Sequence, residues 1–189
     1  MENISAKEQA IIIFQAATPV IKVHGVGGKQ WKRNVAKGSR IGPWLQGTYD
    51  ILNEHTWLQK GACLYLVAGN DSIIRYVGIS RNGLKHRWRT SPAYDAVTMA
   101  RLTQNQIFHS QCWKHIERES TANPTVSFEV RSITAEQITL INSQLSSKIA
   151  SLVEAFKDDG EGIVAGIERW FCNNKANDFL LWNTAMTGR

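Results

Sequence analysis

The sequence predicts an α/β fold of the α+β kind, in which helices flank a small three-stranded antiparallel sheet. Residues 63–67 and 73–77 form two apolar runs, each built around a tyrosine. The turn-forming residues of segment 69–72 separate these runs, so together they predict a β-hairpin. Residues 124–133 alternate between apolar and polar side chains. That alternation is typical of a half-buried strand and predicts the third strand of the sheet.

Capping signals and helical periodicity predict helices before and after the hairpin. Ser5 and Glu8 occupy the positions of a capping box, so residues 5–17 are expected to form an N-terminal helix. Apolar residues recur at helical spacing in segment 84–88, which predicts a helix directly after the hairpin. Residues 101–119 are expected to form one or two helices with a basic face.

Two further helices are predicted after the third strand. Thr134 and Gln137 make a second capping box, and apolar residues then recur every three or four positions. This pattern predicts one long amphipathic helix over residues 134–157. A second helix is expected over residues 162–173, with Glu168 in the middle of an otherwise apolar stretch.

The composition predicts a cytoplasmic protein whose partner is a polyanion. The chain has 189 residues, a formal net charge of +6 and a pI near 9.4. This charge favours nucleic acid as a partner, although a soluble protein that happens to be basic would have the same charge. Cys63, Cys112 and Cys172 lack the spacing of a disulfide framework or a zinc site. We expect no membrane contact, because the sequence shows neither a secretory signal nor an apolar run of membrane-spanning length.

The chain is expected to divide into residues 1–60, an N-terminal helix with a basic, glycine-rich arm, and residues 61–189, the main domain. No acidic residue occurs from position 9 to position 49. Trp31 and Trp44 lie among the positive charges and would either contact nucleic acid or pack the arm onto the main domain. The basic residues of the arm that we expect to contact DNA are Lys29, Lys32, Arg33, Lys37 and Arg40.

A glycine-rich stretch at residues 24–30 is superficially similar to a phosphate-binding loop but does not match the sequence motif of such loops. The spacing from the first glycine to the Gly-Lys pair is too short. Gln30 also stands where a serine or threonine would be needed to hold Mg²⁺. The stretch therefore does not predict a nucleoside triphosphatase, and a glycine-rich turn in a DNA-contacting or dimerising arm is the better interpretation.

The central hairpin resembles that of the GIY-YIG nuclease superfamily. LeuTyrLeu at 64–66 stands where the family has its first motif, and TyrValGly at 76–78 stands where it has the second. LeuLysHisArgTrp at 84–88 resembles the start of the family's first helix, which carries an arginine, here Arg87. The resemblance covers residues 61–183 and implies the family's small sheet with an inserted helix.

Two later stretches extend this resemblance, and one position departs from it. IleGluArgTrp at 167–170 and LeuLeuTrpAsn at 180–183 match the family's glutamate and asparagine, here Glu168 and Asn183. The family often has a histidine or tyrosine one helical turn after its arginine, whereas this chain has Ser91. The residues that could substitute for it are His86, Tyr94 and His109.

The resemblance implies a role for each matched residue. Tyr65 would take a proton from the attacking water, and Arg87 would favour the ionised phenol and grip the phosphate. Glu168 would hold one divalent cation, Mg²⁺ or Mn²⁺. Tyr76 would orient the phosphate or the water, and Asn183 would brace the backbone. By residue type alone, the tyrosines also fit a protein core, and the arginine and glutamate fit a solvated helix surface.

The sequence therefore predicts a metal-dependent endodeoxyribonuclease acting on double-stranded DNA, most simply a stand-alone, restriction-like enzyme. Arg89 and His109 are further candidate DNA contacts. A double-strand cut at a symmetric site would require a homodimer on DNA. The alternatives are a non-specific or structure-specific nuclease in repair, phage defence or toxin action, and a DNA-binding module without catalysis.

Overall fold

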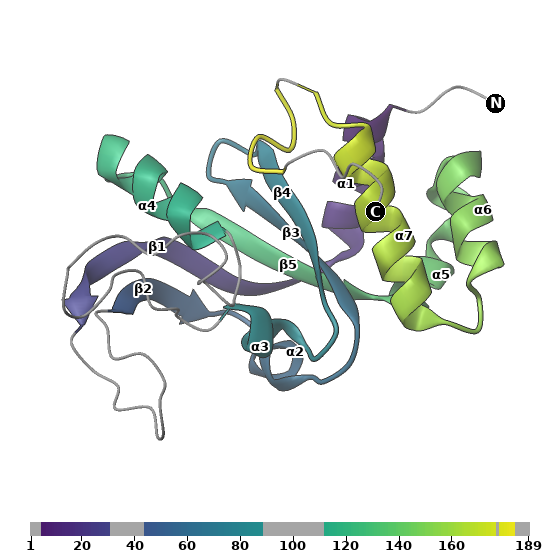
Figure 1. Cartoon of the computed structure of the whole chain (residues 1–189), viewed down its shortest axis with the longest axis horizontal. Helices are drawn as coiled ribbons and strands as arrows, with labels where there is room; N and C mark the ends of the chain where they lie inside the picture. The colour runs from purple at the N-terminus through teal and green to yellow at the C-terminus, as the bar shows by residue number, and fades with distance from the viewer. Residues whose placement is uncertain (1–4, 31–43, 89–111, 177, 184–189) are drawn as a thin grey trace, which may run out of the picture.

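One antiparallel sheet of five strands organises the part of the chain described by the computed structural model, which covers residues 5–30, 44–88, 112–176 and 178–183 (Figure 1). Neighbouring strands follow the order β2-β1-β5-β3-β4, so β4 lies at one edge. The strands are β1 (Thr18–Gln30), β2 (Trp44–Ile51), β3 (Cys63–Gly69), β4 (Ile74–Ser80) and β5 (Phe128–Thr134).

The predicted sheet of three strands was too small, although its three members are present as β3, β4 and β5. The additional pair, β1 and β2, comes from the segment that we expected to be a basic arm. Shifts in strand register occur between Pro19 and Ile21 and between Val23 and Gly25. These irregularities interrupt the alternation of buried and exposed residues, so the sequence pattern of a strand is lost. Because β1 pairs with β5, the sheet includes strands from both sides of the expected domain boundary at residue 61.

The predicted capping boxes are present, but the bounds of the helices differ from the predictions. Capping boxes are present at Ser5 and at Thr134, as predicted. The helix predicted over residues 162–173 begins two residues earlier, after the N-cap Asp159. The helical elements are α1 (Ala6–Ala16), α2 (Glu54–Leu58), α3 (Leu84–Trp88), α4 (Cys112–Ala122), α5 (Ala135–Leu140), the 3₁₀ helix η2 (Asn142–Gln144), α6 (Ser147–Ala155) and α7 (Gly160–Asn173).

The long helix predicted over residues 134–157 was wrong, because the chain turns between α5 and α6. Gln9 of α1 is fully buried, and its side-chain oxygen accepts a hydrogen bond of 2.6 Å from the backbone N–H of Ser146. This bond satisfies a backbone donor at the start of α6 that a continuous helix would have used internally. A contact between residues 137 positions apart cannot be read from local periodicity.

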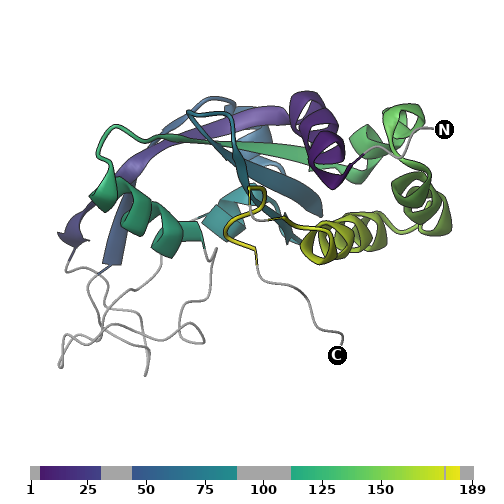
Figure 2. The ribbon, with the colours of Figure 1, turned by 90° about the horizontal axis from the view of Figure 1, so that it is seen from above.

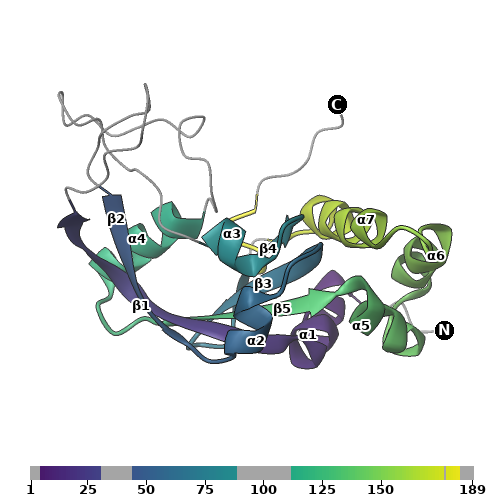
Figure 3. The same cartoon turned by 90° about the horizontal axis from the view of Figure 1, so that it is seen from below.

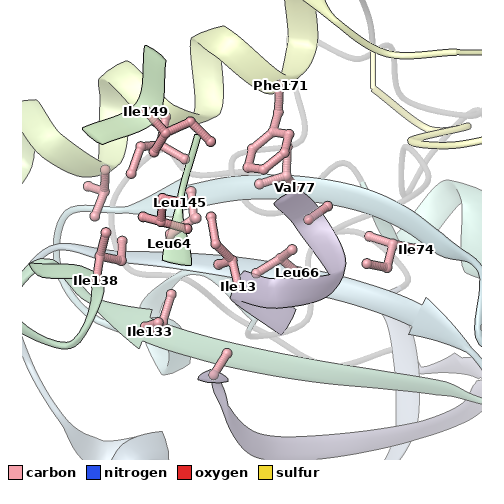
Figure 4. Close-up of a cluster of buried hydrophobic side chains, with 14 of the residues drawn as sticks. Ile13, Leu64, Leu66, Ile74, Val77, Ile133, Ile138, Leu145, Ile149 and Phe171 are labelled. Atoms are coloured by element: carbon pink, nitrogen blue, oxygen red, sulfur yellow. The ribbon is translucent and has the colours of Figure 1, made fainter. Parts of the chain in front are cut away.

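The sheet has a core on each face because successive residues of β3 point in opposite directions. Leu64 and Leu66 lie in one apolar cluster with side chains of α1, α5, α6 and α7 (Figure 4). Tyr65 and Val67 lie in a second cluster, which α2, α3 and α4 cover. Figures 2 and 3 show α4 at one end of the molecule and α1, α5, α6 and α7 at the other. In the described ranges, no helix has both the length and the apolar character that a bilayer crossing requires.

The packing of α4 against the β1–β2 hairpin gives a first prediction. Trp113 of α4 is buried, and a Cβ atom added at Gly47 of β2 would overlap its ring. We expect Gly47→Ala to lower the free energy of unfolding by about 1 to 3 kcal/mol, because a rigid buried indole cannot move aside. Urea unfolding followed by circular dichroism measures this change.

A matched glycine substitution serves as the control for that prediction. A Cβ atom at Gly166 of α7 would make only ordinary contacts, the nearest at 3.7 Å from Leu152. Gly166→Ala should therefore be neutral or should stabilise the protein by up to about 1 kcal/mol, because alanine favours the helix. Equal stability of the two variants would contradict the packing of the hairpin on α4.

Candidate active site

Two of the predicted site residues bind the outward edge of β4. In an antiparallel edge strand, every second residue turns its backbone N–H and C=O away from the sheet. The side-chain oxygen of Asn183 accepts from the N–H of Val77 at 2.9 Å, and its side-chain nitrogen donates to the C=O of Val77 at 2.8 Å. Two residues further along β4, the N–H of Ile79 donates to the carboxylate of Glu168. Neighbouring positions of one strand thus fix Asn183 and Glu168.

The two motif tyrosines stack on the sheet face covered by α3 and α4. The ring centroids of Tyr65 and Tyr76 are 5.9 Å apart with an interplanar angle of 28°. Trp88 meets Tyr65 edge-on at 5.8 Å. Tyr65 is completely buried, and Tyr76 is 8% exposed. Burial of two aromatic rings against each other gives a rigid arrangement with little rotational freedom.

Arg87 of α3 connects this tyrosine pair to the opposite charge of Glu168. The Arg87 Nε donates to the Tyr65 hydroxyl at 3.5 Å, which is the long end of the hydrogen-bond range. Burial lowers the pKa of Arg87, but Tyr65, Tyr76 and Glu168 raise it by more, so the net pKa lies above its ordinary value. Arg87 therefore carries a positive charge throughout the range in which proteins are folded.

Glu168 is a carboxylate held in a partly desolvated position. Burial raises its pKa to about 7, although the charge of Arg87 and the N–H of Ile79 both act to lower it. The desolvation therefore outweighs the attraction of the nearby guanidinium. A cation bound beside Glu168 would favour the charged form of its carboxylate.

Burial also keeps Tyr76 neutral. Its pKa is raised well above 10, first by burial and then by Tyr65, Cys112 and Glu168, while Arg87 opposes the shift. A neutral phenol can donate and accept hydrogen bonds. This protonation state fits the orienting role expected for Tyr76 and does not fit a base.

Gly78 allows the rings of both tyrosines to approach the backbone of β4. A Cβ atom at this position would lie 2.5 Å from the ring of Tyr76 and 2.7 Å from the Tyr65 hydroxyl oxygen. No side chain fits into that space. The glycine of the second motif is thus a steric requirement of the stacked tyrosine pair.

Cys172 is a neighbour of the site that the sequence did not reveal. Its sulfur accepts a hydrogen bond of 3.3 Å from the side-chain nitrogen of Asn183. Burial, followed by the charge of Glu168, raises the pKa of Cys172 to about 11, so the thiol is neutral. Its position four residues after Glu168 on α7 is the only sequence signal that could have indicated it.

The structure therefore brings the predicted catalytic residues together but does not describe most of the predicted DNA contacts. Tyr65, Tyr76, Arg87 and Glu168 interact with one another, and Asn183 binds the same edge strand. Lys29 lies in β1. The expected DNA contacts Lys32, Arg33, Lys37, Arg40, Arg89 and His109 lie outside the described residues. The same holds for Ser91 and for Tyr94, one of its expected substitutes, whereas His86 lies on α3.

A separate hollow of about 480 Å³ lies on the opposite face, between α1 and the sheet. Its charged lining residues include Arg131 and Glu129, which form an ion pair of 2.5 Å with each other. Arg131 also lies over the ring of Phe14 at 4.5 Å. Because Arg131 and Glu129 satisfy each other, we assign the candidate site to the tyrosine face and not to this hollow.

The donor set fits a cation that takes most of its ligands from substrate and water. Within the described ranges, no three histidine, cysteine, aspartate or glutamate side chains gather as a metal-binding group. Mg²⁺ in phosphoryl-transfer sites is commonly held by one or two carboxylates, substrate phosphate oxygens and water. Glu168 is a carboxylate of this kind, since a bound cation would offset the desolvation of its charge.

No family model, curated protein or solved structure matches this chain. The assignment of a function therefore rests on the residues and their geometry.

The close approach at Gly78 gives a second prediction. We expect Gly78→Ala to separate the stacked rings of Tyr65 and Tyr76, because the added methyl group has no free space. The near-ultraviolet circular dichroism of the protein should change, and the free energy of unfolding should fall by about 1 to 3 kcal/mol. An unchanged aromatic spectrum together with full stability would contradict this geometry.

The raised pKa of Glu168 gives a third prediction, on stability in metal-free buffer. The folded protein holds this proton up to pH about 7, whereas the unfolded chain releases it near the ordinary glutamate pKa of 4.5. Stability should therefore fall as the pH rises through this window. The loss is at most about 3 kcal/mol, and less to the extent that water reaches the carboxylate.

Glu168→Gln removes this titration and is the comparison for the third prediction. Urea unfolding of both proteins between pH 4 and pH 8 should show a decline that the wild type has and the variant lacks. Addition of Mg²⁺ at pH 8 should stabilise the wild type more than the variant. Parallel pH profiles would show that Glu168 is not desolvated.

Proposed function

We propose that this chain is a metal-dependent endonuclease that hydrolyses phosphodiester bonds of double-stranded DNA. The observation that supports this most is the convergence of Tyr65, Arg87 and Glu168 from three separate elements, β3, α3 and α7. A phenol, a charged guanidinium and a partly desolvated carboxylate provide a proton acceptor, a phosphate ligand and a cation ligand. Phosphodiester hydrolysis requires these three groups.

In this proposal, Tyr65 accepts the proton of the attacking water, and Arg87 stabilises negative charge on both the phenol and the phosphate. Tyr76 remains neutral and orients the phosphate or the water through its hydroxyl. Asn183 holds the backbone of Val77, which lies between Tyr76 and Gly78 in β4.

Glu168 would hold the divalent cation, Mg²⁺ or Mn²⁺. When bound, the cation supplies positive charge that stabilises the phosphate and the leaving oxygen. The contribution of the chain is to keep Glu168 beside the edge of β4, where the N–H of Ile79 orients its carboxylate.

We further propose a restriction-like enzyme that cuts at a specific sequence, as a homodimer on DNA if the site is symmetric. The net charge of +6 supports a nucleic-acid partner of either specific or non-specific kind. One observation favours the alternative of a DNA-binding module without catalysis, namely that Tyr65 is completely buried. A proton acceptor must become accessible to water, and a module would have no such need.

Plasmid cleavage tests the proposal. The wild type should nick or linearise supercoiled DNA with Mg²⁺ and should stop when the metal is chelated. Tyr65→Phe, Arg87→Ala and Glu168→Gln should each lower the rate by about 10² to 10⁴-fold, because each removes a group that acts in the transition state. Mapping of the cut ends would distinguish specific from non-specific cleavage.

Matched variants control for indirect effects on that cleavage. Tyr49→Phe changes another tyrosine of the same aromatic cluster, and Glu161→Gln changes a carboxylate of α7 that forms an ion pair with Arg81 at 2.6 Å. Both should cut at rates close to the wild type. DNA binding without any nicking would favour the non-catalytic module, whereas equal cutting by all variants would reject the assigned residues.

A further inference from the structure

Glu119 of α4 binds two different elements through the two oxygens of its carboxylate. One oxygen accepts from the indole Nε1 of Trp182 at 2.6 Å, and the other accepts from Nε of Arg75 at 2.9 Å. The side chain of Glu119 is 25% exposed. Charge-assisted hydrogen bonds of this length at a partly buried position are among the stronger polar contacts in proteins.

Arg75 of β4 is a buried charge that depends on this contact. It is 6% exposed, and it donates to both carboxylate oxygens of Asp71, at 2.7 and 2.8 Å. Its guanidinium also lies 5.5 Å from the ring centre of Phe128. A buried guanidinium requires a partner for each N–H, so removal of Glu119 would leave Nε without its acceptor.

Trp182 anchors the end of the described chain to the edge of β4. Its backbone N–H donates to the C=O of Arg75 at 2.9 Å. Its ring is 4% exposed and stacks on His115 at 5.3 Å and packs against Phe128 at 5.2 Å. The position of Asn183 follows from this anchor, because it is the next residue.

We propose that Glu119 is a positioning residue that locks the segment 178–183 onto β4 and thereby sets the site. The two residues that it binds are the sequence neighbours of two site residues, since Arg75 precedes Tyr76 and Trp182 precedes Asn183. The same helix packs against β1, and its Trp113 packs against β2. Through Glu119, the packing of α4 on the sheet therefore determines the positions of Tyr76 and Asn183. The link to catalysis rests on the function proposed above.

A comparison of two variants with a destabilised control tests this role. Glu119→Gln keeps the shape of the side chain, but the amide nitrogen that replaces one carboxylate oxygen cannot accept a hydrogen bond, so either Trp182 or Arg75 loses its acceptor. Trp182→Phe keeps an aromatic ring next to His115 and Phe128 but removes the N–H donor, together with part of the ring volume. Gln9→Ala serves as the control, because it removes a buried hydrogen bond on the opposite face of the sheet.

Amide hydrogen exchange and cleavage kinetics provide two separate measurements. In Glu119→Gln and Trp182→Phe, exchange of the backbone amides of Val77 and Trp182 should rise about tenfold or more, because these amides are protected by the docked segment. The kcat for DNA cleavage should fall about tenfold or more with KM nearly unchanged, because misplacement of a few tenths of an ångström slows chemistry without weakening DNA binding.

The control separates positioning from general destabilisation. Gln9→Ala should lower the overall stability while leaving kcat and the exchange of those two amides near wild-type values. The proposal is overturned if Glu119→Gln leaves exchange and kcat unchanged, or if all three variants lose kcat in proportion to stability. A wild type that never cuts DNA rejects the proposed function and the link to catalysis, whereas the exchange data still decide whether Glu119 holds the segment. If Glu119→Gln does not fold, Trp182→Phe decides in its place.

Discussion

The outward edge of β4 is the constraint on which the candidate site depends. An edge strand leaves every second N–H and C=O without a strand partner, and proteins cover such groups. Here the backbone of Trp182 and the side chains of Asn183 and Glu168 bind consecutive outward positions of β4. Two of these three groups, Asn183 and Glu168, are also residues of the candidate site. Loss of the hydrogen bonds to the edge of β4 would therefore also displace Asn183 and Glu168.

The opposite orientations within the hairpin explain why the site needs more than one helix. Tyr65 and Tyr76 face α3 and α4, whereas Val77 faces α7 and its apolar cluster. Glu168, on α7, must therefore reach the tyrosines around the edge of β4 and not across the sheet. Arg87, on α3, approaches them from the face of the sheet on which the tyrosines themselves lie. Side chains from the helices on both faces of the sheet can therefore reach the motif tyrosines only at this edge.

Local patterns predicted the parts of the molecule that depend on nearby residues. The hairpin, the third strand and both capping boxes are confirmed, because alternation and capping act within a few residues. The pairing of β1 and β2 into the sheet was missed, because register shifts interrupt the alternation of β1. The break before α6 and the contacts of Glu119 depend on partners 137, 44 and 63 positions away, and no local pattern records these. The tyrosine roles remain predictions from the resemblance.

The electrostatics of Arg87 and Glu168 support the proposal that this pair serves an ionic substrate and not the stability of the fold. A buried ion pair that served stability would hold the carboxylate fully charged, with its pKa below the ordinary value. The pKa of Glu168 is instead raised to about 7 despite Arg87, so the attraction is too weak to offset burial. A cation at Glu168 and an anion at Arg87 would each supply the compensation that the two residues do not give one another. The metal ion and the phosphate of the proposed reaction would together provide that combination of charges.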